Sequence, residues 1–378
     1  MSRAARFEAA LQGLERRSRR RRLAPRQGAD FASNDYLGLA DSPRLKAAVA
    51  DALERGVPVG AAGSRLLRGN HPEHEALEAE AAAFFGAGRA LYMGAGYAAN
   101  VALVSTLPQR GDLVVCDALV HASVHDGLRD AKAEVAFAAH NDAEAVADAI
   151  AAWRARGGRG QPFIVAESLY SMDGDRAAAG DLLGLAERHD GFLILDEAHA
   201  TGVFGAGGRG LGEALEGSDA LIAVHTCGKA LGASGALVTG PAPIVDTLIN
   251  RAKPFVYATA PSPLMAAAVR EALRIVADEP DRRTRLHGLV ALAGERLARL
   301  GLPASGSQIQ PVILGQNARA AALAASLQAG GFDCRAIRPP TVPEGTARLR
   351  ISLTLNVDEA TVAALIDAIA ERVAEAAA

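Results

Sequence analysis

The chain has 378 residues, half of them apolar, and its 40 Lys and Arg against 43 Asp and Glu give a net charge of −3. This length predicts one large domain with a smaller partner, or two comparable domains. No apolar run approaches the 18 or more residues that cross a bilayer. Without a basic excess, nucleic acid is not expected as a partner, so the composition predicts a soluble protein with neither membrane nor nucleic acid among its partners.

The N-terminal segment carries six arginines between positions 16 and 22, with no apolar stretch behind them that would indicate a secretory signal. The segment is interpreted either as a solvated amphipathic helix or as an arm that lends one arginine to an anionic substrate. Elsewhere, three widely spaced cysteines form no C-x-x-C pair. Their pattern predicts neither zinc nor disulfides and favours a reducing, cytoplasmic location.

From about residue 41 to residue 240, short β-rich apolar runs alternate with Ala-rich stretches of helical length. The runs lie at 91–93, 113–116, 135–137, 163–166, 192–195, 221–224 and 236–238. Apolar strands that alternate with helices predict an α/β domain with a mainly parallel sheet. Because such sheets bind ligands beyond the carboxyl ends of their strands, the residues that follow each run are the first candidates for a site.

Beyond Pro261 the pattern changes and predicts a smaller α+β domain. The expected elements are a helical stretch over 262–300, strands at 309–314 and 347–353, and helices at 318–329 and 358–377. The predicted domains are therefore an N-terminal arm (1–40), a large α/β domain (41–261) and a small C-terminal domain (262–378).

Asp196 directly follows the apolar run at 192–195, in the sequence Asp-Glu-Ala-His. Burying a carboxylate at a strand end is costly unless a cation or a hydrogen-bond donor contacts it. Such a position suits a carboxylate that pairs with a protonated ring nitrogen. His199 can reach the same ligand from the loop. The alternative is an N-cap aspartate beside a core histidine. A helicase is excluded, because the phosphate-binding G-x-x-x-x-G-K-[ST] loop that it needs is missing.

Lys229 stands after the run at 221–224, between glycines and at the same end of the predicted sheet. Partly apolar surroundings lower the pKa of a lysine amine and suit it to form a Schiff base. The alternative is a solvated surface charge.

The segment 94–99 follows another apolar run and reads G-x-G-x-x-A, a turn that can present backbone amides to a phosphate. The same pattern, with Asp117 after the next strand, is also the fingerprint of a dinucleotide site, so an NAD-dependent oxidoreductase is the rival from another class. That rival leaves Asp196, His199 and Lys229 without a role, whereas one molecule of pyridoxal 5′-phosphate (PLP) uses all of them.

His121 and His125 stand four residues apart, as zinc ligands on a helix do, but no glutamate follows His121 to complete the H-E-x-x-H motif. No metal site is therefore predicted. A flat imidazole stacked on a flat cofactor ring is the preferred interpretation of His121, and a capping or core position remains open for His125.

Together these segments resemble the α-oxoamine synthase family of fold-type I PLP-dependent enzymes over nearly the whole chain. The motifs that carry the resemblance are Ser33-Asn34-Asp35-Tyr36-Leu37-Gly38-Leu39, Gly63-Ser64-Arg65, His121-Ala122-Ser123, Ser171-Met172-Asp173-Gly174-Asp175, the segment 196–203, Thr226-Cys227-Gly228-Lys229 and Arg348-Leu349-Arg350. The resemblance implies a large PLP-binding α/β domain beside a small α+β domain, and a homodimer.

The resemblance also implies a role for individual residues. Lys229 would hold PLP as a Schiff base and act as general base, Asp196 would pair with the ring nitrogen, and His121 would stack on the ring. Further cofactor contacts are implied for His199 and Thr226 near its phenolic oxygen and phosphate, for Gly96 and Tyr97 at the phosphate end, and for Ser171 beside the cofactor. Those implied to contact substrate are Arg20, His121, Arg338 and Thr341, with Arg21 as eligible as Arg20.

The segments 336–343 and 345–350 are similar to one branch of the family, which joins L-alanine to a pimeloyl thioester with loss of carbon dioxide in biotin biosynthesis. The sequence leaves open whether the thioester is pimeloyl-CoA or pimeloyl-ACP, the acyl carrier protein form. It also leaves open another family member that uses glycine or serine. Pro339 and Pro340 stiffen the backbone after Arg338, which predicts a guanidinium presented from a rigid extended segment.

Overall fold

The computed structural model describes residues 3–375, which divide into two compact units. The first unit comprises residues 3–36, 172–175 and 284–375, and the second comprises 37–171 and 176–283. The domain boundaries predicted from the sequence, at 40–41 and 261–262, stay predictions. By compactness the chain changes unit after Tyr36 and after Arg283 instead.

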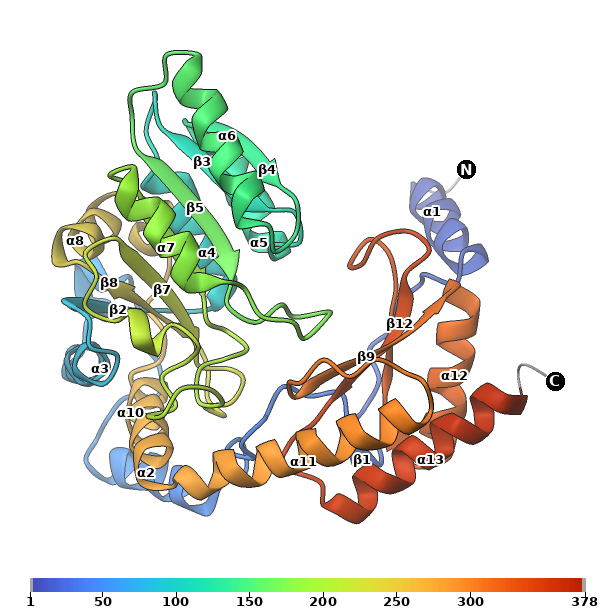
Figure 1. Ribbon diagram of the computed structural model, residues 1–378. Helices are drawn as coiled ribbons and strands as arrows, with labels where there is room; N and C mark the ends of the chain where they lie inside the picture. Colours follow the sequence, from blue (N-terminus) through green and yellow to red (C-terminus); the bar gives the residue numbers. More distant parts are fainter. Residues whose placement is uncertain (1–2, 376–378) are drawn as a thin grey trace. The chain divides into compact units, whose positions relative to one another are not determined.

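The second unit is built on a seven-stranded sheet in the order β2-β8-β7-β6-β5-β3-β4 (Figure 1). Its strands are β2 (Arg89–Met93), β3 (Leu113–Asp117), β4 (Glu134–Ala138), β5 (Pro162–Glu167), β6 (Phe192–Asp196), β7 (Leu221–Thr226) and β8 (Ala236–Gly240). The strands from β4 to β7 are parallel, whereas β8 is antiparallel to both β7 and β2. The predicted mainly parallel sheet is confirmed, and each of the predicted runs in it is a strand.

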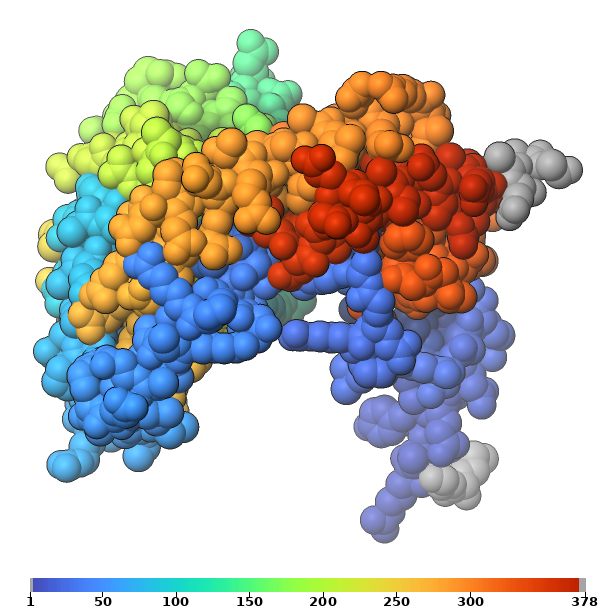
Figure 2. All heavy atoms as spheres, turned by 90° about the horizontal axis from the view of Figure 1, so that it is seen from below, coloured from blue at the N-terminus to red at the C-terminus, as the bar shows by residue number. Residues whose placement is uncertain are grey.

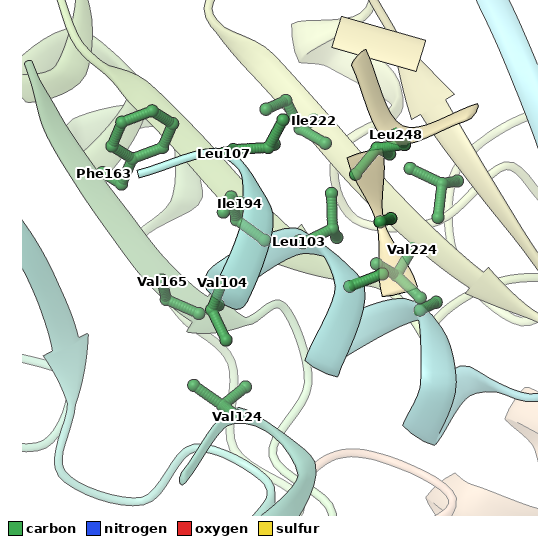
Figure 3. Packing of buried hydrophobic residues seen from close by; sticks show 14 of the residues in the cluster. Leu103, Val104, Leu107, Val124, Phe163, Val165, Ile194, Ile222, Val224 and Leu248 are labelled. Atoms are coloured by element: carbon green, nitrogen blue, oxygen red, sulfur yellow. The ribbon is translucent and has the colours of Figure 1, made fainter. Parts of the chain in front are cut away.

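Helices cover both faces of this sheet. One face is covered by α4 (Gly96–Thr106), α5 (Ala122–Leu128), α8 (Ala242–Arg251) and α9 (Lys253–Val256), and the other by α6 (Ala143–Ala155) and α7 (Ala179–Arg188). Figure 3 shows Leu103 of α4 and Leu107, which directly follows this helix, packed in one cluster with Ile194 and Val224 of the central strands. Burial on both faces explains why β3, β5 and β6 are apolar at every position until their last residue.

The second unit also contains α2 (Pro43–Glu54), α3 (Pro72–Phe84), α10 (Pro263–Asp278) and two short turns, η1 (Arg65–Gly69) and η2 (Glu213–Leu215). The helix predicted over 262–300 is wrong as a single element, because α10 ends at Asp278 and α11 (Pro280–Arg299) begins at Pro280. Proline lacks the amide hydrogen for the helical ladder and disfavours helical geometry in the residue before it, so the helix ends there.

The first unit holds an antiparallel sheet in the order β11 (Arg335–Ile337), β12 (Ala347–Ser352) and β9 (Ile309–Gly315). A short parallel pair, β1 (Ala29–Asp30) and β10 (Phe332–Asp333), accompanies it. The helices α12 (Asn317–Ala329) and α13 (Glu359–Glu375) confirm the predicted ones, apart from residues 376 and 377, which lie outside the described part. Figure 2 shows α13 along α11, where Arg296 pairs with Asp367.

The N-terminal arm differs from a single amphipathic helix. Helix α1 (Ala5–Arg16) buries none of its residues and ends before Arg19. Residues 19–22, with four consecutive arginines, have no regular secondary structure. Mutual repulsion of neighbouring guanidinium groups is consistent with this early helix end.

Candidate active site

Three polar residues end three neighbouring strands of the large sheet. Glu167 ends β5, Asp196 ends β6 and Thr226 ends β7. Each stands two positions after a valine or isoleucine of the core against α4, namely Val165, Ile194 and Val224. Because side chains alternate between the faces of a strand, all three polar side chains lie on the α4 face, at the carboxyl edge of the parallel strands.

Asp196 is held by donors on both carboxyl oxygens. Asn100 Nδ2, from α4, donates to Oδ2 at 2.7 Å, and the backbone amide of Ala198 donates to Oδ1 at 2.8 Å. The Asn100 amide also donates to Ser123 Oγ at 3.0 Å. These bonds fix the carboxyl group in a buried position, where it can meet a protonated ring nitrogen.

The ring of His121 is oriented by the start of α5. Its Nδ1 accepts from the Ser123 amide at 3.3 Å and lies 2.7 Å from Ser123 Oγ. An accepting Nδ1 places the ring proton on Nε2. Although the residue is exposed, the protein around it lowers the pKa of His121, chiefly by desolvation and despite the opposing effect of Asp196. The structure therefore presents a neutral, flat imidazole that is connected to Asp196 through Ser123 and Asn100.

His125 takes no part in this network. It is exposed, and its ring stacks on Phe137 with centroids 5.3 Å apart. Tyr97 meets the His121 ring edge-on at 6.3 Å, and its hydroxyl donates to Asp126. That His121, and not His125, stacks on the cofactor ring stays a prediction.

Lys229 and His199, predicted independently, lie side by side. Lys229 Nζ is 2.8 Å from His199 Nε2, and His199 is buried while Lys229 is half-buried. The two residues come from the loops after β7 and β6. This places an amine and an imidazole beyond the carboxyl ends of the strands that bear Thr226 and Asp196.

Gly96 opens α4 in contact with Thr226. The preceding Ala95 is extended, and the first turn of α4 contains no acidic residue. A Cβ atom on Gly96 would come within 2.5 Å of Thr226 Cγ2, so only glycine fits without displacement. The free amides of this helix start and the Thr226 hydroxyl, which donates to the Ala198 carbonyl at 3.2 Å, form a setting suited to a phosphate.

Three residues of the site were missed from the sequence, namely Asn100, Ser123 and Glu167. Glu167 is 3% exposed, and its Oε2 accepts from the amide of Ser171 at 3.1 Å. Burial raises the pKa of Glu167 to about 8, with Asp196 adding to the effect and Lys229 opposing it. Its place directly after the apolar run at 163–166 is the signal that singled out Asp196, so the same rule would have found it.

Polar residues on the opposite face of the sheet are structural. His225 stacks on Phe85 with centroids 3.6 Å apart and lies between Thr201 Oγ1 and Thr239 Oγ1. Glu197 accepts hydrogen bonds from Ser168 and from two backbone amides. Neither side chain faces the network of Asp196.

The dinucleotide rival lacks its structural setting. Asp117 accepts from His140 Nδ1 at 2.9 Å and from the amides of Leu119 and Asn141, so it closes a loop. The strand before the glycine turn, β2, is an edge strand that pairs antiparallel with β8. A dinucleotide fingerprint needs a parallel βαβ unit there.

Apart from His121, the predicted substrate residues belong to the first unit. Arg21 Nη2 donates to Thr341 Oγ1 at 2.8 Å, whereas Arg20 lies 3.4 Å from Glu15. Arg338 donates to the Ser18 carbonyl, and burial together with Arg21 lowers the pKa of its guanidinium. Of the two arginines that the sequence left eligible, Arg21 is thus the one in contact with Thr341.

Metal and thiol chemistry find no support among residues 3–375. No group of three or more His, Cys, Asp or Glu side chains there is placed to hold a metal ion. The three cysteines are buried, and burial raises the pKa of Cys116 and of Cys334 to about 12. Within the same residues, no helix combines the length and the apolar character needed to span a bilayer.

Comparison with known proteins adds the following. The family model for aminotransferase class I and II matches residues 26–369. The 8-amino-7-oxononanoate synthase of Anaeromyxobacter dehalogenans is 44% identical over 378 residues, covering 96% of this chain and 94% of that protein. The enzyme of the same name from Methylobacterium radiotolerans is 43% identical over 373 residues, covering 95% and 96%.

Two solved structures share the fold. Serine palmitoyltransferase from S. paucimobilis, with a bound PLP-myriocin aldimine, has a TM-score of 0.87 at 26% identity and covers 98% of each chain. The 8-amino-7-oxononanoate synthase from Francisella tularensis has a TM-score of 0.77 at 27% identity, covering 93% of this chain and 99% of that one. The predicted fold-type I architecture is confirmed by these structures and by the family match.

The buried imidazole of His225 generates a pH prediction. Burial lowers its pKa from 6.5 to about 3, so between these values the unfolded chain binds a proton that the folded chain does not. The free energy of unfolding should therefore decrease as the pH is lowered through this window, by up to about 1.4 kcal/mol per pH unit. In His225→Gln, which keeps polar atoms near Thr201 and Thr239, this contribution disappears. Urea unfolding of both proteins from pH 7 to pH 4 measures the difference.

His189→Gln, at the partly exposed end of α7, controls for the substitution itself and should follow the wild-type pH dependence. A constant difference in unfolding free energy between wild type and His225→Gln at every pH would show that the buried imidazole does not resist protonation.

Proposed function

Because the chain belongs to the aminotransferase class I and II family and is a PLP-dependent acyltransferase, we propose that it condenses L-alanine with a pimeloyl thioester. The products would be 8-amino-7-oxononanoate, carbon dioxide and the free thiol, in biotin biosynthesis, and the first of these products is the one that the relatives are named for. The contact between Lys229 and His199, beside the buried Asp196, is the observation that carries the proposal. A cytoplasmic location and a homodimer belong to the same proposal.

The residues present fit PLP. The glycine start of α4 and Thr226 suit its phosphate, and Asp196 suits its ring nitrogen. The neutral ring of His121 suits a stacked aromatic partner, and the half-buried amine of Lys229 suits the aldehyde. At the same edge of the sheet, the buried carboxyl oxygen Oε1 of Glu167 lacks a hydrogen-bond partner among residues 3–375.

When bound, PLP supplies an electron sink that accepts the electron pair left on the α-carbon of the amino acid. The protein's part is to place charge and protons. Asp196, fixed by Asn100 and Ala198, stabilises a positive charge at the ring nitrogen. Lys229 Nζ takes the α-proton of alanine as general base, and His199 at 2.8 Å keeps that amine in place.

The remaining steps concern the acyl donor. The α-carbon of alanine forms a bond to the thioester carbonyl carbon, and the bond from that carbon to sulfur breaks, so the thiol leaves. The resulting β-keto acid loses its carboxylate as carbon dioxide, and a proton returned by Lys229 completes the product. Both pimeloyl-CoA and pimeloyl-ACP supply the same reacting carbonyl, so these steps are the same for either donor.

Arg338 is proposed to bind the carboxylate of alanine. Thr341, together with Arg21 or Arg20, is proposed to contact the substrate. The two other arginines near Arg338 in sequence have structural partners. Arg348 is ion-paired with Asp173, and Arg350 donates to Ser352 Oγ, Asn34 and Tyr36. Arg338 has no ion-pair partner in the described part of the chain, so its planar guanidinium remains available for a carboxylate.

A second candidate within the same chemistry is condensation of serine with a long acyl thioester. It is favoured by the structural similarity to serine palmitoyltransferase, whose TM-score exceeds that of the Francisella enzyme. The 8-amino-7-oxononanoate synthases resemble the chain far more closely in sequence, which supports alanine and the pimeloyl group.

Lys229 should carry the cofactor covalently. The purified protein should be yellow, and borohydride reduction followed by peptide mapping should place one stable pyridoxyl group on Lys229. Lys229→Ala should abolish the label, whereas Lys253→Ala, at an exposed lysine, should retain it. A label on another lysine instead would show that Lys229 is not the residue that binds the cofactor.

A substrate matrix tests the proposed reaction. Alanine, glycine and serine are each combined with acetyl, pimeloyl and palmitoyl thioesters, and free thiol and carbon dioxide are measured. Turnover should be highest with alanine and the pimeloyl thioester, and the two products should form in equal amounts. Highest turnover with serine and the palmitoyl donor would instead establish the second candidate.

Arg338→Lys should raise the apparent KM for alanine about tenfold or more, because a lysine cannot form the paired hydrogen bonds of a guanidinium to a carboxylate. PLP content and melting temperature should stay nearly unchanged. Arg348→Lys is the matched control, since Arg348 is buried in an ion pair, and it should lower the melting temperature while the alanine KM holds. An unchanged alanine KM in a well-folded Arg338→Lys enzyme would contradict the assignment.

A further inference from the structure

Glu167 and Asp196 form a pair of carboxyl groups at the edge of the sheet. They are register partners on the neighbouring strands β5 and β6, and their side chains lie on the same face. Both are buried. Two neighbouring carboxylates that are this poorly solvated repel each other, and the pair favours a state in which one of them keeps its proton.

Hydrogen bonding shows which of the two is the acid. Asp196 accepts one donor on each oxygen, as an ionised carboxylate requires. Glu167 accepts one backbone amide on Oε2, and its buried Oε1 has no partner among the described residues. The rise in the pKa of Glu167 to about 8, caused first by burial and then by Asp196, agrees with a neutral acid at Glu167.

A neutral carboxyl group with a free oxygen can donate one hydrogen bond. Glu197 provides the contrast within this chain, because that buried glutamate has hydrogen bonds on both oxygens, from Ser168, Leu211 and Gly212. A buried hydroxyl left without an acceptor is unfavourable, so the unused position at Glu167 calls for a partner supplied by whatever occupies the site.

The order of the strands indicates which oxygen of the cofactor that partner is. Thr226, Asp196 and Glu167 end β7, β6 and β5, three adjacent strands in this order. With the ring nitrogen at Asp196 and the phosphate at Thr226, the side of the ring that bears the phosphate arm points toward β7. A line drawn through the ring nitrogen and the aldehyde-bearing carbon of PLP divides the ring into two sides. The phosphate arm is on one side and the hydroxyl group is on the other, so the hydroxyl group faces β5.

We propose that Glu167 is a cofactor-binding residue that stays protonated and donates its carboxyl hydrogen to the ring oxygen of PLP. In this arrangement Asp196 is the single anion of the pair, so its charge is directed to the ring nitrogen. The Ser171 amide, donating to Oε2, leaves Oε1 as the donating atom. The proposal rests on the cofactor and on the places given to Asp196 and Thr226, and not on the choice of amino acid or acyl donor.

Cofactor binding to the apoprotein tests the hydrogen bond. Glu167→Gln keeps a neutral donor, whereas Glu167→Met keeps the approximate volume and removes it. Affinity is measured for PLP and for 3-deoxypyridoxal 5′-phosphate, which lacks the ring oxygen. PLP should bind to Glu167→Met about tenfold or more weakly than to wild type, and to Glu167→Gln within about threefold. The deoxy analogue should bind to all three proteins within about threefold.

An equal loss of affinity for PLP and for the analogue in Glu167→Met would overturn the hydrogen bond to the ring oxygen. So would a Glu167→Gln protein that binds PLP as weakly as Glu167→Met. Because no substrate is used, these outcomes are independent of the substrate matrix that tests the proposed reaction.

The protonation state of Glu167 is tested in the apoprotein. Infrared spectra of the apoprotein at pH 6 should contain the carbonyl stretch of protonated buried carboxyl groups, and Glu167→Gln should remove part of that band. Glu197→Gln is the matched control at a second buried glutamate, and a double substitution should remove the sum of the two losses. If Glu167→Gln leaves the band unchanged, Glu167 is ionised and the proposal fails, even if Glu167→Met does not fold.

Discussion

The buried carboxyl group of Asp196 is the constraint to which the rest of the site responds. Placed at the end of a central strand under α4, it loses the solvation that an exposed aspartate would have. Within the described part of the chain, Asp196 receives two hydrogen bonds, from Asn100 and from the Ala198 amide. Two neutral donors do not compensate a buried negative charge, so a cationic ring nitrogen, the partner proposed for Asp196, would complete the site electrostatically.

One amide side chain connects that carboxyl group to the stacking ring. Asn100 donates to Asp196 and to Ser123, and Ser123 in turn orients His121. The position of the imidazole is thus tied to the position of the carboxylate through α4 and the start of α5. A cofactor held between the two would be positioned in its plane by Asp196 and above its plane by His121, with little freedom for either to move alone.

The sequence predicted the strands and their carboxyl ends well, because apolar runs that end in a polar residue are a local signal. Asp196, Thr226 and Lys229 were found in this way, or by resemblance to a family. Asn100 was not found, since its role depends on which strand α4 covers, and that is tertiary information. Glu167 carried the same local signal as Asp196 and was overlooked, because strand order alone makes the two residues neighbours.

Other features could not be read from a linear pattern. The Ala-rich composition of 262–300 is helical throughout, and only the single Pro280 divides it. The short strands β1, β10 and β11 have two or three residues each, too few for any periodicity to emerge. Which arginine of the arm meets Thr341 likewise depends on the path of an irregular segment, in which neighbouring side chains of the same type differ only in direction.

The first unit shows how a single arginine can be kept available in a basic region. Arg348 and Arg350 stand on β12 and are buried, where an unpaired guanidinium would be costly, and each has acceptors close by. Arg338 follows the short edge strand β11 and is only half-buried, so it needs fewer partners and donates to a single carbonyl, that of Ser18. The remaining donors of its fork are therefore not committed to the fold. An anionic substrate group gains the most binding free energy at such a position, because it does not have to break an ion pair that formed on folding.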